Sequence, residues 1–163
     1  AAYQSAAAAA SGGTPANVGS YSDLGIQIVP EAIDGLSIGY ATGESDETAT
    51  VSVDHETIWV KYAYGSFTVG VQQSERDGGT AATLDESDSF GISYAVTDEF
   101  SVSYGQHEYE EGTNANSQDS TGISASYTSG GVTMSAAFNS TDNIQTSAAD
   151  DEDSFELAVS FAF

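Results

Sequence analysis

Apolar and polar residues alternate along most of the chain. At the end of the chain, Phe155, Leu157, Val159, Phe161 and Phe163 share one parity, while small or polar residues hold the other. A period of two is typical of a β-strand with one apolar face. The alternation recurs at residues 24–28, 36–40, 58–64, 67–71, 90–96, 100–104, 123–127, 132–138 and 155–163. The sequence therefore predicts an all-β fold with nine strands.

The connections between these segments alternate between short and long. The short ones are residues 29–35, 65–66, 97–99 and 129–131, and the long ones are 41–55, 73–87, 107–120 and 139–152. Antiparallel hairpins that turn tightly at one end of a sheet and loosely at the other give this order. Nineteen of the 25 acidic residues lie in or beside the long connections, so we expect the negative charge at one end of the sheet.

The two faces of the strands favour a membrane environment. The polar positions hold mainly Ser, Gly, Ala and Thr with few charges, whereas the outer face of a soluble sheet is usually rich in charged residues. The apolar positions hold Tyr and Phe near strand ends and Val, Ile and Leu between them. This layout predicts an antiparallel transmembrane β-barrel, whose closure leaves no open edge in lipid. A soluble acidic β-sandwich stays open as the alternative.

Composition excludes several other classes of protein. The 163 residues include 2 Lys+Arg and 25 Asp+Glu, giving a formal net charge of −23. Nucleic acid is therefore not an expected partner, because its phosphates need basic side chains. The absence of Cys excludes disulfides, thiolate zinc sites and a Cys nucleophile within these residues. An aromatic content of 10% argues against a disordered acidic chain.

The terminal segment resembles a known class of strand. Residues 155–163 resemble the last strand of Gram-negative outer-membrane proteins, which ends in alternating aromatics with a C-terminal Phe. Residues 18–163 resemble the C-terminal half of a general bacterial porin. The resemblance implies the outer membrane of a Gram-negative bacterium, contact with the lipid bilayer and lipopolysaccharide, and a homotrimer. It also implies that the barrel assembly machinery reads Phe161 and Phe163.

The strand count suggests that this barrel is larger than the chain. Residues 1–17 contain a low-complexity Ala-rich stretch and read as the tail of an outer loop, followed by barrel strands over 18–163. Bacterial single-chain barrels have an even number of strands, and nine is odd. By resemblance to general porins we expect these to be the last nine of sixteen strands. A complete barrel of eight or ten strands is the competing count.

Strand parity selects the residues that would line the pore. Asp23, Gln27, Trp59, Lys61 and Glu156 lie on the polar parity of their segments. Lys61 is the only Lys of the chain. The only Arg, Arg76, falls in a long connection.

Catalytic and metal-binding signals are weak. His55 and His107 lie at the bases of long connections and are expected to be solvated, and no nucleophile elbow accompanies them. We therefore expect no enzyme activity and no cofactor. Asp150, Asp151, Glu152 and Asp153 form the densest acidic run and could hold Ca²⁺, although they lack EF-hand spacing.

These features predict passive diffusion of small hydrophilic solutes and ions through a water-filled pore. The acids of the long connections, together with Asp23 and Glu156, would form an electronegative vestibule that attracts cations at low salt. Two other functions remain open. One is a small closed outer-membrane barrel with a structural or adhesive role, and the other is a secreted acidic β-sandwich that binds metal ions.

Overall fold

The computed structural model describes residues 21–48, 51–78, 84–148 and 150–162, which form a single sheet. Its strands are β1 (Tyr21–Ile28), β2 (Leu36–Thr48), β3 (Val51–Tyr64), β4 (Phe67–Asp77), β5 (Leu84–Ala95), β6 (Phe100–Glu111), β7 (Gln118–Ser129), β8 (Val132–Asp142) and β9 (Glu152–Phe161). Each strand pairs antiparallel with its neighbours in the chain. This confirms the predicted all-β fold with nine strands. The predicted loop tail at 1–17 and Phe163 lie outside the described residues.

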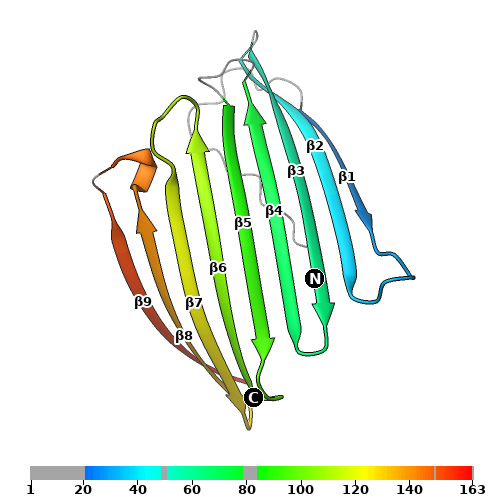
Figure 1. Ribbon diagram of the computed structural model, residues 1–163, viewed down its shortest axis with the longest axis vertical. Coiled ribbons are helices and arrows are strands. Elements are labelled where there is room, and N and C mark those ends of the chain that lie inside the picture. Colours follow the sequence, from blue (N-terminus) through cyan, green and yellow to red (C-terminus); the bar gives the residue numbers. More distant parts are fainter. Residues whose placement is uncertain (1–20, 49–50, 79–83, 149, 163) are drawn as a thin grey trace.

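The short connections gather at one end of the sheet, here called the turn end (Figure 1). Two of them are two-residue hairpin loops, at Gly65–Ser66 and Gly130–Gly131. Gly65 has φ 57°, and Gly130 and Gly131 have φ 58° and 82°. Tight hairpins of this kind need positive φ, which glycine adopts without steric cost. The opposite end of the sheet is called the loop end.

The strands extend further toward the loop end than the alternation predicted. The predicted long connections at 41–55, 73–87, 107–120 and 139–152 are largely strand, because pairing continues beyond the apolar stretches. Between β2 and β3 it reaches Thr48 and Val51. The extents predicted for these connections were therefore wrong. Beyond the apolar stretches, the contrast between the two parities ends, whereas the backbone pairing of the strands continues.

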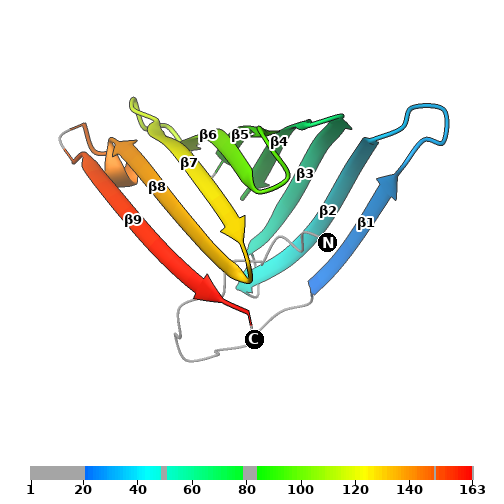
Figure 2. The same cartoon turned by 90° about the horizontal axis from the view of Figure 1, so that it is seen from below.

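The sheet curves into an open trough, with β1 and β9 as the two edge strands of its described part (Figure 2). Cross-strand register assigns every side chain to one of two faces, because directly opposite residues point the same way. One row crosses eight strands entirely through apolar residues: Leu36, Tyr62, Val69, Ile92, Tyr104, Ile123, Phe138 and Phe155. We call this side, which is convex, the apolar face, and the concave side the polar face.

The apolar face has no second layer among the described residues. Among the described residues, the only buried hydrophobic side chain is that of Val53, which lies on the polar face. On the apolar face, Ile92 is 38% exposed, Leu157 61% and Phe155 70%. A soluble β-sandwich would bury such side chains between two sheets. The single exposed layer therefore contradicts the sandwich alternative and fits a sheet that faces lipid.

Aromatic side chains gather on the apolar face near the turn end. Tyr64 lies opposite Phe67, and Phe67 lies opposite Tyr94. The rings of Phe67 and Tyr94 stack with centroids 4.3 Å apart. Phe100 and Tyr127 form another opposite pair. Aromatic girdles at this height mark the membrane–water interface of outer-membrane barrels.

The β8–β9 connection is fastened to the neighbouring loop end. It contains the short 3₁₀ turn η2 (Ile144–Thr146), of which Thr146 is buried. The Thr146 hydroxyl accepts a hydrogen bond from Asn114 Nδ2 at 2.8 Å and donates to Glu111 Oε2 at 3.3 Å. The backbone N–H of Gln145 donates to Gln118 Oε1 at 2.9 Å. These bonds anchor the connection to β6 and β7.

Candidate functional site: the polar face of the sheet

Glycine and hydroxyl residues dominate the polar face. One continuous row across it consists of Ser37, Lys61, Gly70, Gly91, Gly105, Gly122, Asn139 and Ser154. Four adjacent strands thus place glycine side by side, at β4, β5, β6 and β7. A Cβ added at Gly70, Gly91 or Gly105 would meet only backbone oxygens at 3.6–4.0 Å. Bare backbone therefore forms the middle of this wall.

Cross-strand hydrogen bonds tie the polar face together. Ser103 Oγ and Ser124 Oγ lie 2.7 Å apart, and Ser120 Oγ and Thr141 Oγ1 lie 3.1 Å apart. The Thr57 hydroxyl donates to Ser74 Oγ at 3.0 Å. No buried polar side-chain atom in the described part of the chain lacks a partner. The wall is hydrophilic, and its hydroxyl groups hold one another in place.

Both histidines belong to this wall and not to loops. His55 Nε2 lies 3.1 Å from Ser45 Oγ, and His107 Nδ1 lies 2.9 Å from Ser89 Oγ. The prediction that they lie at loop bases was wrong, since His55 is in β3 and His107 in β6. No Ser–His–carboxylate chain of hydrogen bonds connects either imidazole to an acid within the described residues.

A hollow opens on the polar face where the glycines leave space. Its volume is about 560 Å³. Gly105 and Gly122 lie opposite each other in it, between His107 and Ser124. Because no side chain projects from the two glycines, the hollow is open and offers polar atoms at its rim.

A row of charges crosses the polar face nearer the loop end. It runs through Asp23, Gly43, His55, Arg76, Asp85 and Glu111. Arg76 Nη1 donates to Asp85 Oδ2 at 3.0 Å. The placement of Arg76 in a loop was wrong: it is a wall residue of β4. No alternation marks this stretch in the sequence, because Gln73, Glu75 and Asp77 on the opposite parity are polar as well.

The structure places all five predicted pore-lining residues on the polar face. Gln27 and Trp59 share a row, with Gly39 between them. The Trp59 indole lies across Gly39, where an added Cβ would overlap the ring. Lys61 lies opposite Ser37 and Gly70. That these residues line a water-filled lumen stays a prediction.

The other two lie apart from them on edge strands. Asp23 belongs to β1 and Glu156 to β9. Glu156 lies opposite Ala137, in the middle of its strand. Sequence parity therefore predicted the correct face of the sheet for both residues.

The acidic residues divide unevenly between the two faces. Seventeen of the nineteen acids expected in or beside the long connections belong to strands, leaving Asp150 and Asp151 in a loop. Thirteen lie on the apolar face, above its apolar band: Glu44, Asp46, Asp54, Glu56, Glu75, Asp77, Glu86, Asp88, Glu108, Glu110, Asp119, Asp142 and Asp153. The polar face holds Asp23, Asp85, Glu111, Glu152 and Glu156. The prediction that all these acids form one electronegative vestibule was therefore wrong, because most of them point away from the concave side.

The run Asp150–Asp153 is not gathered into a metal site. Asp151 Oδ1 accepts the backbone N–H of Asn143 at 3.1 Å, and Asp153 lies on the apolar face opposite Ser140. In the described ranges, no three His, Asp or Glu side chains converge as metal ligands. Calcium binding at this run stays a prediction. Those ranges also contain no helix of the length and hydropathy that a membrane span requires.

Comparison with known proteins supplies the family. The family model of Gram-negative porins matches residues 4–163. The chain belongs to the Gram-negative porin family. A porin refined at 1.8 Å resolution matches this porin chain with a TM-score of 0.65 and 16% identity, over 84% of this chain and 50% of that one. OmpT of Vibrio cholerae, expressed in the outer membrane, matches with a TM-score of 0.56 and 16% identity, over 85% and 54%.

These matches have defined limits. No curated protein matches this porin chain by sequence. The chain spans about half the length of the two solved structures, and identity of 16% shows the fold alone. Family membership confirms the resemblance to a Gram-negative porin and places the protein in the outer membrane of a Gram-negative bacterium. It also favours a channel over an enzyme.

Proposed function

We propose that the chain forms part of the wall of an outer-membrane pore, through which small hydrophilic solutes and ions diffuse passively. The observation that carries this is the contrast between two adjacent rows. The row from Leu36 to Phe155 is apolar across eight strands, while the neighbouring row from Ser37 to Ser154 holds only glycine, small polar residues and Lys61. Lipid fits one side of such a sheet, and water fits the other.

The edge strands support a barrel of sixteen strands. In an alternating antiparallel sheet of nine strands, β1 and β9 run in the same direction. Pairing them directly would create a parallel joint, so antiparallel closure requires an odd number of added strands. Seven more strands give sixteen, a number known for porins. The half-length coverage of the solved porin supports this count.

The proposed pore prefers cations, though by less than the total charge implies. On the described part of the polar face, five carboxylates stand against Lys61 and Arg76, and Asp85 is already paired with Arg76. The reversal potential under a KCl gradient measures this preference. It should shrink as salt rises, because the Debye length falls from about 10 Å at 0.1 M to about 3 Å at 1 M. Anion preference at low salt would contradict the proposal.

Family membership supports two further proposals. We expect a homotrimer among lipid and lipopolysaccharide, and mass measurement in mild detergent would contradict it by finding a monomer. We also expect the barrel assembly machinery to read the terminal aromatics. Phe161 is 60% exposed on the apolar face. A Phe161→Ser variant should insert poorly in cells, whereas Ser160→Ala should insert normally.

Single-channel recording tests the pore itself. The full-length protein, isolated from outer membranes and added to a planar lipid bilayer, should give stepwise conductance that increases with salt concentration. Protein that inserts, shown by protease protection, and yet gives no steps would contradict the proposal. That result would favour a closed barrel.

A further inference from the structure

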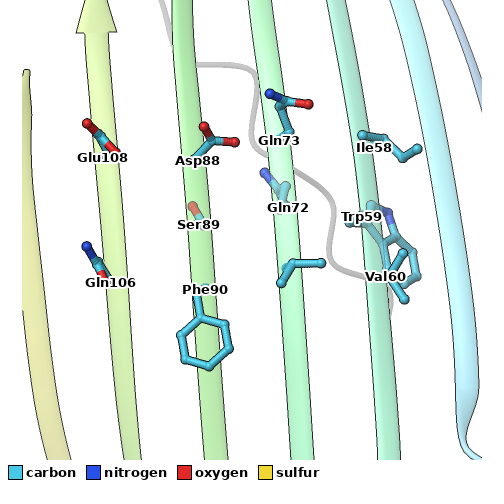
Figure 3. Close-up of a pocket in the computed structure, with 11 residues that line it drawn as sticks. Ile58, Trp59, Val60, Gln72, Gln73, Asp88, Ser89, Phe90, Gln106 and Glu108 are labelled. Atoms are coloured by element: carbon cyan, nitrogen blue, oxygen red, sulfur yellow. The ribbon is translucent and has the colours of Figure 1, made fainter.

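A second hollow opens on the apolar face, at the boundary between the apolar band and the acidic rows. Its volume is about 400 Å³, and it spans β3 to β6. Its loop-end rim is a row of directly opposite residues: Ile58, Gln73, Asp88 and Glu108. Figure 3 shows Gln73, Asp88 and Glu108 side by side on adjacent strands. The rim thus presents two carboxylates and an amide.

The floor of this hollow is mostly apolar. Val60, Val71, Phe90 and Gln106 form the next row toward the turn end, with Phe90 below Asp88 in Figure 3. Val71 is 49% exposed and Phe90 39%. The hollow therefore combines an apolar surface, on the side toward the membrane core, with a charged rim on the side toward water.

The two carboxylates of the rim have no basic side chain opposite them among the described residues. Asp88 and Glu108 lie directly opposite each other, and like charges so placed repel. The only basic side chains, Lys61 and Arg76, both lie on the other face of the sheet. In the described part of the chain, no ion pair reaches Asp88 or Glu108. A positive group that pairs with them would therefore come from outside these residues.

We propose that this hollow binds an acyl-chain amphiphile whose headgroup carries a primary ammonium. The acyl chain lies on Val71 and Phe90, and the ammonium donates hydrogen bonds to both Asp88 and Glu108. Charge complementarity selects a cation, and the adjoining apolar floor selects one attached to a lipid. An ammonium suits the site better than a bare metal ion, since no three acidic or imidazole side chains converge in the described ranges. The proposal depends on location in the membrane and not on pore activity.

Lipids with a primary or a quaternary ammonium headgroup test whether binding depends on hydrogen bonds to Asp88 and Glu108 or on the positive charge alone. A primary ammonium has three N–H donors, whereas a trimethylated one has none. We therefore expect the full-length protein in detergent, given equal amounts of phosphatidylethanolamine, phosphatidylcholine and phosphatidylglycerol, to retain the first about tenfold over the second, as one charge-assisted hydrogen bond allows. Native mass spectrometry counts the bound lipids.

Matched variants locate the effect. Asp88→Asn combined with Glu108→Gln should abolish the preference for phosphatidylethanolamine. Glu56→Gln combined with Glu75→Gln removes an equal charge from a directly opposite pair nearer the loop end and should leave the preference intact. Val71→Trp fills the hollow without changing its charge and should also abolish retention, with folding checked by circular dichroism.

Three results would overturn the proposal. One is equal retention of phosphatidylethanolamine and phosphatidylcholine by the unmodified protein. Another is an equal loss of preference in both double variants, which would show that only the total charge matters. The third is retention of phosphatidylglycerol above phosphatidylethanolamine in the presence of magnesium, which would indicate a cation bridge. None of these results depends on conductance.

Discussion

The two faces of this one sheet satisfy their polar groups in opposite ways. On the polar face, hydroxyls, imidazoles and the Arg76–Asp85 pair bond to one another across strands. The apolar face holds thirteen acids, and one of its rows runs through Glu56, Glu75, Glu86 and Glu110, so that each of these four carboxylates lies opposite another. The polar face carries both basic side chains, Lys61 and Arg76, whereas the four carboxylates of that row on the apolar face have no basic residue opposite them.

A charge introduced into the apolar band should have the largest effect on stability. Ile92 lies on the apolar face of β5 and Ser93, its neighbour, on the polar face. Ile92→Arg should lower the free energy of unfolding in lipid vesicles by about 2–4 kcal/mol, the cost of placing Arg near the bilayer midplane. Ser93→Arg should change it by no more than about 0.5 kcal/mol, because its side chain reaches water. Urea titration measures both, and equal losses would contradict the assignment of faces.

Two glycines of the polar face should respond in opposite directions. Gly39→Ala should cost about 1–3 kcal/mol, because the new methyl group overlaps the Trp59 indole. Gly91→Ala should stabilise by about 0.5–1 kcal/mol, because its methyl group meets nothing closer than Tyr104 O at 4.0 Å. Unfolding midpoints compare the two, with Trp59 fluorescence reporting whether the ring has moved. A stable Gly39→Ala protein with unchanged fluorescence would contradict the packing of the Trp59 ring against Gly39.

Two adjacent acids of β5, Asp85 and Glu86, lie on opposite faces and should affect ion selectivity differently. Asp85→Asn removes a charge from the polar face and should reduce cation preference in dilute KCl, while stability falls by no more than about 1 kcal/mol, since the pair with Arg76 is partly exposed. Glu86→Gln should leave selectivity unchanged. It should raise stability by about 0.2–1 kcal/mol, because Glu86 lies opposite Glu75 and Glu110. Equal selectivity shifts would show that face does not matter.

Local alternation was enough to predict the strands and their faces. In β9, the order Phe155, Leu157, Val159 and Phe161 against Ser154, Glu156 and Ala158 fixes both the element and its sides. Trp59 and Lys61 were assigned to the polar face on the same grounds. Alternation works here because a sheet between lipid and water needs contrast at every second residue.

The loop ends could not be predicted in this way. In Gln73–Asp77 both parities are polar, so the contrast disappears while the pairing continues to Leu84. The acids of that region were therefore read as loop residues, and Arg76 with them. Contacts between strands could not be predicted either. The packing of Trp59 on Gly39 and the pairing of Asp88 with Glu108 depend on the register between segments that are about 20 residues apart in the sequence.

The central claim is that one face of the sheet meets water inside a pore while the other meets lipid. Because these residues contain no Cys, single-Cys variants at Leu157, Ala158, Val159 and Ser160 each place one thiol on a known face of β9. A water-soluble, membrane-impermeant thiol reagent applied to the protein in membranes should label positions 158 and 160 and spare 157 and 159. Equal labelling of all four positions would contradict the account.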